Sequence, residues 1–429
     1  MKLETTSSDP PLPEEEQSEG PAPYRQLTVI GFTFWLNYLA YGLIIPLTPT
    51  MMSYYLSEYS VPAVLMGGVA ATIYGLSQVF FGPVWGAFSD HRGRKPILLW
   101  SLWIQFAVQI LWIFSDTIWL FLVVRAMTGV TSGNMSITSA AISDSTSRKY
   151  RLIGMNVLAM GFALGSTLSP LIGGLLVKVN PLDYFPVWGS LGVNPFSFVA
   201  FGSLFFCSIN LILVYSLFNE SHPEKARTHI LDISFTKILG RLRRVPEKSM
   251  NQLNFVFLIF VFAYAAVQFN LAFLALERYN WSASKTSLLY ATSGIFQLIS
   301  QSLILPRISK EYNERECSYI GFVLATLGVG LMAMPLHSWA LVAGLIFLAI
   351  GAGLAFPALS SLASLYAPAD RQGEYLGLFR ARAAMGSGLG PVVLGSLFAI
   401  TNPGIAFGLF SLLYLIAFLT ARGLPEPHK

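Results

Sequence analysis

The stretch Gly86-Ala-Phe-Ser-Asp-His-Arg-Gly-Arg-Lys95 follows one long apolar segment and precedes another. Gly86 permits close helix packing and Gly93 a tight turn, because neither carries a Cβ atom. The carboxylate of Asp90 can face the N-terminus of a neighbouring helix, while the cations can bind carboxylates or lipid phosphates. This order predicts a charged turn between two membrane helices, at the inner surface. The alternative is a simple basic loop.

The composition is that of a membrane protein. Of 429 residues, 54% are hydrophobic and only 11% are charged, whereas a soluble chain carries about 25% charged residues. An apolar segment of at least about 17 residues can cross a bilayer as a helix. The sequence predicts about twelve such segments: 27–53, 61–88, 96–115, 117–141, 152–178, 195–218, 252–277, 284–306, 316–335, 339–366, 373–400 and 403–421.

The distribution of Lys and Arg predicts the orientation. With the N-terminus inside, 21 of the 27 Lys and Arg residues fall in cytosolic tails and loops, and three (Lys178, Arg278 and Lys285) on the opposite face. A missed span would reverse every later loop, so this asymmetry supports the helix count. The net charge of +5 therefore reflects membrane topology, and nucleic-acid binding is not expected. With only Cys207 and Cys317 present, neither a disulfide framework nor a metal cluster is expected.

The longest inner connection divides six predicted helices from six. It contains a basic stretch, 235–244, with apolar residues spaced for one helical face, which predicts a short helix on the inner leaflet. A solvated linker is the alternative. The predicted regions are a disordered cytosolic tail (1–24), an N-terminal six-helix bundle (25–218), this linker (219–251), a C-terminal bundle (252–421) and a cytosolic tail (422–429).

The two halves resemble each other weakly. Residues 165–174 read Gly-Ser-Thr-Leu-Ser-Pro-Leu-Ile-Gly-Gly, and residues 386–395 read Gly-Ser-Gly-Leu-Gly-Pro-Val-Val-Leu-Gly. Both segments place glycines and a proline where helices must bend and pack closely. Paired segments of this kind are typical of transporters that rock about a site at the membrane midplane.

The stretch 86–95 closely resembles the G-x-x-x-D-R-x-G-R-R signature of the major facilitator superfamily. Arg125-Ala-Met-Thr-Gly129 looks like that family's fourth-helix motif, and Ser169-Pro-Leu-Ile-Gly-Gly174 like its antiporter motif. Segments beginning at Arg278, Phe356 and Asp370 resemble tetracycline/proton antiporters and their eukaryotic relatives. The likeness spans nearly all of residues 25–421. It implies twelve helices in two pseudo-symmetric bundles, and an inner gate of Gly86, Asp90, Arg94, Lys95 and Asp144.

The chain departs from the tetracycline exporters at their acidic positions. Asn37 stands where those exporters carry an Asp in the first helix, and the regions around 108–109 and 325–326 are uncharged. The usual proton-coupling and cation sites therefore do not carry over to this chain. Asp90 and Glu277 remain as candidates for coupling.

Three arginines, Arg125, Arg380 and Arg382, lie inside apolar segments, where a charge costs roughly 3 kcal/mol or more. No carboxylate is expected inside these apolar segments, and this favours an anionic cargo. Such an anion could bridge Arg125 of the first half and Arg380 of the second. Alternatively, Arg125 bonds the backbone of the first helix and Arg380 contacts Glu374 or Asp90. Arg382 is about 200° round the helix from Arg380, so the two cannot share one face.

Uncharged polar residues predict the rest of the site. They occur at i, i+4 spacing on helices expected to line a central cavity, where they could bind cargo or hold helices together at about 0.6 kcal/mol each. These candidates are Asn37, Tyr41, Tyr264, Gln268, Gln297 and Gln301.

The sequence thus predicts a secondary transporter of a small amphipathic organic molecule, preferably an anion. Proton-coupled multidrug efflux and import of a carboxylate-rich metabolite or siderophore are the alternatives. A transport-inactive sensor is disfavoured by the intact stretch 86–95, and an enzyme by the lack of a nucleophile–base pair. We expect a monomer without cofactor that acts on a small molecule, with protons as candidate co-transported ions. Without a targeting signal, a bacterial inner membrane is favoured over a eukaryotic one.

Overall fold

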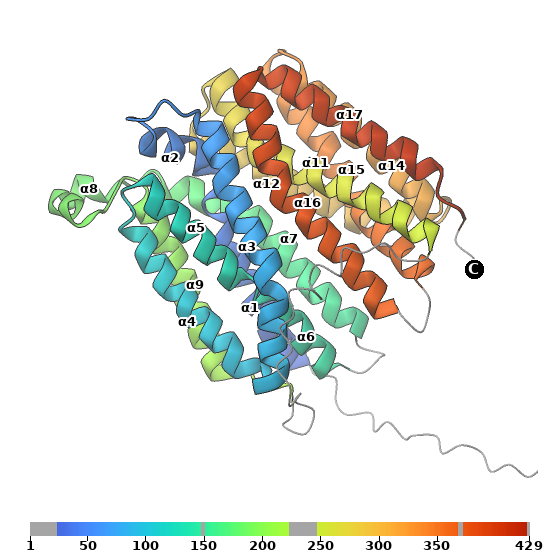
Figure 1. Ribbon diagram of the computed structural model, residues 1–429, viewed down its shortest axis with the longest axis horizontal. Helices are drawn as coiled ribbons and strands as arrows, with labels where there is room; N and C mark the ends of the chain where they lie inside the picture. The colour runs from blue at the N-terminus through green and yellow to red at the C-terminus, as the bar shows by residue number, and fades with distance from the viewer. Residues whose placement is uncertain (1–23, 147–150, 223–246, 368–371, 427–429) are drawn as a thin grey trace, which may run out of the picture.

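The computed structural model describes residues 24–146, 151–222, 247–367 and 372–426, which form helices and turns without any strand (Figure 1). The predicted disordered tail, apart from Tyr24, and the predicted amphipathic helix at 235–244 lie outside these described residues. Tyr24 itself already begins the first helix.

The helices are arranged as two bundles. The N-terminal bundle contains α1 (Tyr24–Gly42), η1 (Ile45–Leu47), α2 (Thr48–Tyr55), α3 (Ala63–Arg92), α4 (Arg94–Ile113), α5 (Ile118–Ser132), α6 (Met135–Ser145), α7 (Arg151–Leu176), α8 (Pro181–Tyr184), η2 (Pro186–Leu191) and α9 (Ser197–Leu217). The C-terminal bundle contains α11 (Lys248–Tyr279), α12 (Ala283–Ile299), the π-helical turn η4 (Ser300–Ile304), α13 (Leu305–Ile308), α14 (Glu314–Ala333), α15 (Ser338–Tyr366), α16 (Gln372–Ile400) and α17 (Pro403–Arg422).

Eleven helical spans in the described part of the chain are long and apolar enough to cross a membrane. The predicted span 117–141 is not one continuous helix, because Gly133 and Asn134 separate α5 from α6. A Cβ atom on Gly133 would lie 2.8 Å from the ring of Trp85, and Asn134 donates a hydrogen bond from Nδ2 to Ser101 Oγ (3.1 Å). The break therefore fits closely against α3 and α4, and α5 and α6 in succession make the remaining crossing (Figure 1).

Apolar side chains face outward along helices at the edge of the bundle. Trp100 and Trp103 of α4 and Phe205 of α9 are 57–61% exposed. Patches of this kind are rare on soluble proteins and suit contact with lipid. The protein is a multi-pass integral membrane protein.

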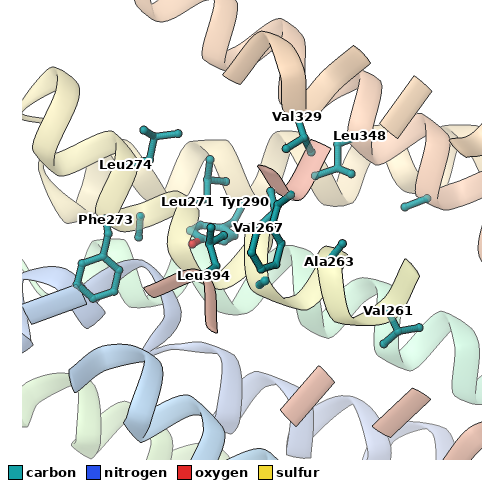
Figure 2. Close-up of a cluster of buried hydrophobic side chains, with 14 of the residues drawn as sticks. Val261, Ala263, Val267, Leu271, Phe273, Leu274, Tyr290, Val329, Leu348 and Leu394 are labelled. Carbon is teal, nitrogen blue, oxygen red and sulfur yellow. The ribbon is translucent and has the colours of Figure 1, made fainter. Parts of the chain in front are cut away.

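The C-terminal bundle has a tightly packed interior (Figure 2). Val267 and Leu271 of α11 lie with Tyr290 of α12 in one apolar cluster, which also includes Leu394 of α16. Glycines bring α14 and α15 together, since a Cβ atom on Gly328 would lie only 2.4 Å from a backbone oxygen of α15. Such small-residue contacts let membrane helices pack by van der Waals forces.

The two bundles meet through α3 with α16 and α7 with α12 (Figure 1). We call the end with the α3–α4 turn the inner end, and the opposite end the outer end. The contacts between the bundles lie towards the outer end: Gly68 packs on Pro391, and Ser284 donates a hydrogen bond from Oγ to the Gly174 carbonyl oxygen (2.6 Å). The outer end is therefore closed.

Gly174→Val should weaken this outer closure, because a Cβ atom there would lie 2.3 Å from Ser287 Oγ. Spin labels at Lys178→Cys and Lys285→Cys, in a background with both native cysteines replaced by serine, should report a longer mean distance in the variant. Gly82→Val is the matched control, since nothing lies within 4 Å of a Cβ atom at Gly82. Equal distance distributions in the two glycine variants would contradict the role of Gly174.

Candidate substrate cavity and inner gate

A cavity of about 390 Å³ lies between the two bundles. It is walled by α1, α3 and α7 of the first bundle and by α11, α12, α15 and α16 of the second. None of the residues that line it is Asp, Glu, Lys, Arg or His. Its aromatic and polar lining residues are Tyr38, Tyr41, Tyr74, Phe162, Tyr264, Phe269, Tyr290, Phe356, Gln78, Ser166, Ser169, Gln268, Ser293, Gln297 and Ser387.

A hydrogen-bonded network of neutral side chains forms the second bundle's wall of the cavity. Gln268 donates from Nε2 to Tyr264 Oη (2.9 Å) and to Ser293 Oγ (3.0 Å). The Tyr264 hydroxyl donates to Gln297 Oε1 (3.1 Å), and the Tyr290 hydroxyl donates to the Gln268 carbonyl oxygen (2.9 Å). These hydrogen bonds hold the wall together without any charge, while the Gln268 Oε1 atom is buried and has no hydrogen-bond partner among the described residues.

Four of the six predicted neutral site residues line this cavity, namely Tyr41, Tyr264, Gln268 and Gln297. Asn37 is buried but does not line it. The cavity face of α1 is the row Tyr38, Tyr41 and Ile45, and Asn37 lies one residue, about 100°, away from it. The sequence pattern of polar residues at i, i+4 therefore missed Tyr38, whereas the spacing i, i+3, i+7 of a helix face would have found it.

Gln301 does not line the cavity either. It falls within the π-helical turn η4, which inserts extra backbone into the helix that begins as α12. The preceding turn presents Ser293 and Gln297 to the cavity, but the π-helical turn changes the rotation, and Ser300 instead donates a hydrogen bond to the Ile350 carbonyl oxygen (2.8 Å). Regular helical spacing therefore predicted the wrong facing for Gln301.

Arg125 of α5 lies behind the first bundle's wall. Its side chain is buried, and its guanidinium carbon lies 4.7 Å from the ring centroid of Tyr74 and 5.7 Å from that of Tyr41. These two rings stack on each other at 4.4 Å and line the cavity. Within the described residues Arg125 makes no ion pair and no hydrogen bond to the backbone of α1, so the backbone contact considered from the sequence is not present.

Arg380 is exposed near the inner end of α16 and does not line the cavity. It precedes Ser387 by seven residues and Pro391 by eleven, so all three occupy one face of the helix. Ser387 and Pro391 line the cavity, and Arg380 therefore stands on the same face about 10 Å nearer the inner end. Arg125 and Arg380 do not meet across the cavity in this conformation.

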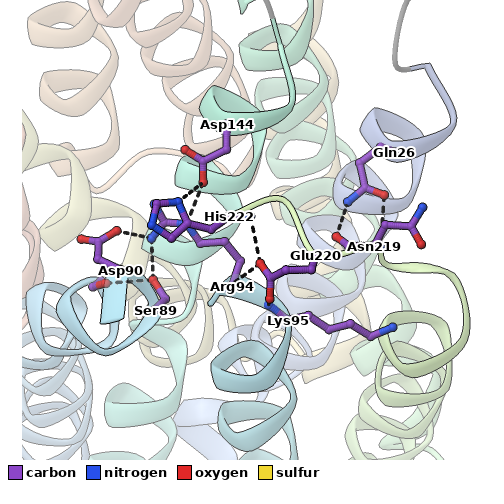
Figure 3. Close-up of polar contacts among 10 residues, drawn as sticks. Gln26, Ser89, Asp90, Arg94, Lys95, Asp144, Asn219, Glu220 and His222 are labelled. Carbon is purple, nitrogen blue, oxygen red and sulfur yellow. Dashed lines mark hydrogen bonds and ion pairs between the residues drawn. The ribbon is translucent and has the colours of Figure 1, made fainter. Parts of the chain in front are cut away.

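Of the predicted gate residues, Asp90, Arg94, Lys95 and Asp144 lie together at the inner end of the first bundle (Figure 3). The close helix packing expected at Gly86 is not found, because the nearest atom to a Cβ there would be Ser136 Oγ at 4.0 Å. Arg94 is 5% exposed, and its guanidinium binds the carboxylates of Asp90 and Asp144 (2.8 Å to Asp144) and the hydroxyl of Ser89 (2.7 Å). Asp90 thus pairs with Arg94, whereas the sequence had left open a contact with Arg380. Gly93, at φ +100°, makes the turn that separates α3 from α4.

Three residues of the cluster, Ser89, Glu220 and His222, were not among the predicted gate residues. Glu220 accepts hydrogen bonds from the backbone N–H groups of Arg94 (2.8 Å) and Lys95 (3.2 Å), so its carboxylate caps the N-terminus of α4 (Figure 3). His222 places Nδ1 3.7 Å from Asp144. The available signal was the acid in Asn219-Glu220-Ser221-His222, directly after the sixth apolar segment, where the predicted inner surface is mostly basic.

The two coupling candidates lie away from the cavity. Asp90 belongs to the gate cluster, with a side chain that is 45% exposed. Glu277 is exposed near the outer end of α11, next to Arg278, whose guanidinium binds backbone carbonyl oxygens at the end of α14. Neither carboxylate lines the cavity.

Asp144→Ala should lower the stability of the purified protein by about 1–3 kcal/mol, because the buried Arg94 guanidinium loses a charge-assisted hydrogen bond. Thermal unfolding in detergent measures the effect. Asp116→Ala, which removes an exposed carboxylate at the outer end, is the control. A similar decrease in melting temperature for both variants would show that the cluster adds no stability.

Comparisons with known proteins agree with this architecture. The model of the Major Facilitator Superfamily matches residues 30–338 and 253–429. The mouse major facilitator superfamily domain-containing protein 10 is 26% identical, over 95% of each chain, and the class H tetracycline resistance protein of Pasteurella multocida is 26% identical, over 90% of this chain and 93% of that protein. The crystal structure of the human organic anion transporter MFSD10 (TETRAN) aligns with a TM-score of 0.72 at 22% identity, covering 94% of this chain and all of that one. The chain belongs to the major facilitator superfamily.

Proposed function

We propose that this transporter moves a small amphipathic organic anion across the membrane by alternating access. The observation that carries the proposal is a buried guanidinium, Arg125, that has no carboxylate partner in the described chain and lies directly behind the cavity wall. The human and mouse relatives support it, since the human protein is called an organic anion transporter.

The surroundings of Arg125 leave its charge poorly compensated. Removing an ion from water costs several kcal/mol, and a desolvated cation–π contact returns only about 2 kcal/mol. An anion on the cavity side of Tyr41 and Tyr74 would lie roughly 8 Å from the guanidinium and gain about 2 kcal/mol at an effective dielectric constant of ~20. The cavity therefore favours a negative charge over a neutral or positive one.

The volume of the cavity and its aromatic and polar lining indicate the size, shape and polar groups of the cargo. The cavity volume of about 390 Å³ falls within the range of small-molecule sites. Aromatic rings from both bundles suit a flat apolar body, and the network around Gln268 offers amide and hydroxyl groups for polar substituents. Tyr41, Tyr264, Gln268 and Gln297 remain our candidates for direct contact with cargo, and Asn37 and Gln301 for support behind it.

Arg380 has a separate part in the proposed cycle. With the outer end closed and Arg380 exposed on the cavity face of α16, we infer an inward-facing conformation in which Arg380 attracts the anion before it reaches the cavity. Closing the inner end would reduce the distance between Arg380 and the first bundle, and a bound anion would favour that closure.

Transport of the anion can be coupled to protons in more than one way. None of the described residues that line the cavity is Asp or Glu, so a proton that travels with the cargo, or exchange of one anion for another, fits the cavity better than an intramembrane acid. Asp90 and Glu277 remain the candidates if the protein itself carries the proton. We also propose a monomer with both termini in the cytosol. The predicted bacterial inner membrane stays a prediction, because the relatives include mammalian as well as bacterial proteins.

Multidrug efflux is the second candidate function. The aromatic lining and the class H tetracycline resistance relative favour it. In that case Arg125 would be structural, and lipophilic cations would be carried as readily as anions. Import of a carboxylate-rich metabolite is a third candidate, but it would need more cations near the cavity than Arg125 and Arg380.

Arg125→Gln should reduce kcat/KM for a monovalent aromatic carboxylate about 30-fold, the equivalent of the ~2 kcal/mol attraction. Uptake of the corresponding neutral amide should change little. Arg380→Gln should mainly raise KM for the anion. Proteoliposomes with purified protein give these rates, and a thermal-unfolding curve checks that each variant is folded. Lys178→Gln, an exposed cation at the outer end, is the control.

Two results would count against an anion site. If Arg125→Gln lowers uptake of acid and amide equally, the arginine has a structural role. If the wild-type protein carries lipophilic cations as fast as the carboxylate, multidrug efflux is the better description.

A further inference from the structure

A second cavity, of about 460 Å³, lies at the inner end of the C-terminal bundle. It is formed by α13, the turn after it, the start of α14 and the inner half of α15. Its lining includes Pro306, Glu314, Cys317, Pro357 and Ser361. None of its lining residues lines the central cavity, so the two cavities are separate.

This cavity lies where the first bundle has its gate cluster. In the first bundle, Gly93 is the N-cap of α4 and Arg94 is the first residue of the helix. In the second bundle, Asn313 is the N-cap of α14 and Glu314 is the first residue. Each helix follows the inner turn after the second crossing of its bundle. The position that carries a buried cation in one half therefore carries a carboxylate in the other.

The surroundings of the two positions also differ. Arg94 is enclosed by Asp90 and Asp144. Glu314 faces an open cavity, where its Oε1 accepts a hydrogen bond from Ser361 Oγ (3.4 Å). In the described part of the chain no Lys or Arg pairs with Glu314, and the neighbouring Arg315 is directed to the Tyr319 hydroxyl (3.2 Å) and to Glu426 (3.9 Å) instead.

We propose that this second cavity binds a small organic cation with an amidinium, guanidinium or ammonium group. Glu314 supplies the counter-charge, and a planar amidinium can bind a carboxylate through two parallel hydrogen bonds. Ser361 Oγ offers a further acceptor, and Pro306, Pro357 and Ala358 provide an apolar wall. The volume is that of a small-molecule site.

The position of the cavity gives its occupant an effect on transport. Phe356 lines the central cavity and the next residue, Pro357, lines the second cavity, so α15 separates the two. Pro306 follows the π-helical turn η4, and prolines and π-helical turns are the places where helices bend. A ligand between α13, α14 and α15 would hold these segments in the present arrangement and slow the cycle without competing with cargo. The slowing of transport rests on the proposed transport function, whereas binding of the cation to the second cavity does not depend on it.

Benzamidine is a suitable probe, with benzamide as its neutral counterpart and benzoate as its anionic one. Calorimetry with the full chain in lipid nanodiscs should show saturable binding of benzamidine, with benzamide and benzoate weaker by about tenfold or more. Glu314→Gln should remove this preference. Glu311→Gln, which changes an exposed carboxylate outside the cavity, should retain it.

Alkylation of the Cys317 thiol can report on ligand binding in the second cavity. In a Cys207→Ser variant, Cys317 is the one remaining cysteine and it lines the second cavity. Cys317 is only 1% exposed, so its alkylation by N-ethylmaleimide should already be slow; bound benzamidine should slow it further, and this protection should disappear when Glu314→Gln is added.

The proposal is overturned if benzamidine binds the Glu314→Gln variant as tightly as the wild type, if benzamide binds as tightly as benzamidine, or if no binding occurs at millimolar concentrations. An absence of anion transport in proteoliposomes would contradict the proposed function and leave these binding results as they stand.

Discussion

A guanidinium group taken out of water needs a counter-charge or strong hydrogen-bond acceptors, and this requirement distinguishes the surroundings of Arg94 from those of Arg125. Arg94 meets it completely, with two carboxylates and a serine hydroxyl around it and Glu220 on the adjoining helix N-terminus. Arg125 meets it only with the faces of two tyrosine rings. The contacts of Arg94 hold the inner end of the first bundle together. The charge of Arg125 has no carboxylate partner in the described chain and can attract an anionic ligand. One physical rule therefore separates a structural cation from a candidate binding cation.

Much of the architecture could be predicted from the sequence, because hydropathy and Lys/Arg placement follow directly from the bilayer. The charged cluster at the inner end could be predicted as well, since Asp90, Gly93 and Arg94 lie close together in the chain and Asp144 matches an acidic position of the family; its role as a gate stays a prediction. The break between α5 and α6 could not, because it depends on how Gly133 and Asn134 fit against α3 and α4. The predicted apolar segment 117–141 runs across that break, so hydropathy alone does not locate it.

The cavity was predicted less well than the fold, for a geometric reason. A single residue of offset turns a side chain by about 100°, which is enough to exchange Tyr38 for Asn37 at the cavity surface. A π-helical turn adds a similar offset and moves Gln301 away from the face of Gln297. For α16, periodicity placed Arg380 and Arg382 on different faces but did not decide which of them faces the cavity. Whether Arg125 and Arg380 act on one ligand depends on a change of conformation that a sequence pattern does not encode.

The interrupted fourth crossing has a mechanical consequence. The outer helix, α5, carries Arg125 and the inner helix, α6, carries Asp144. Gly133 and Asn134 form the break between them. Asn134 is tethered to Ser101 of α4, and Gly133 abuts Trp85 of α3. A continuous helix would tilt as one rigid body, but the break lets α5 and α6 tilt separately. A tilt of α5 would therefore act on α3 and α4, which contact the break, as well as on α6.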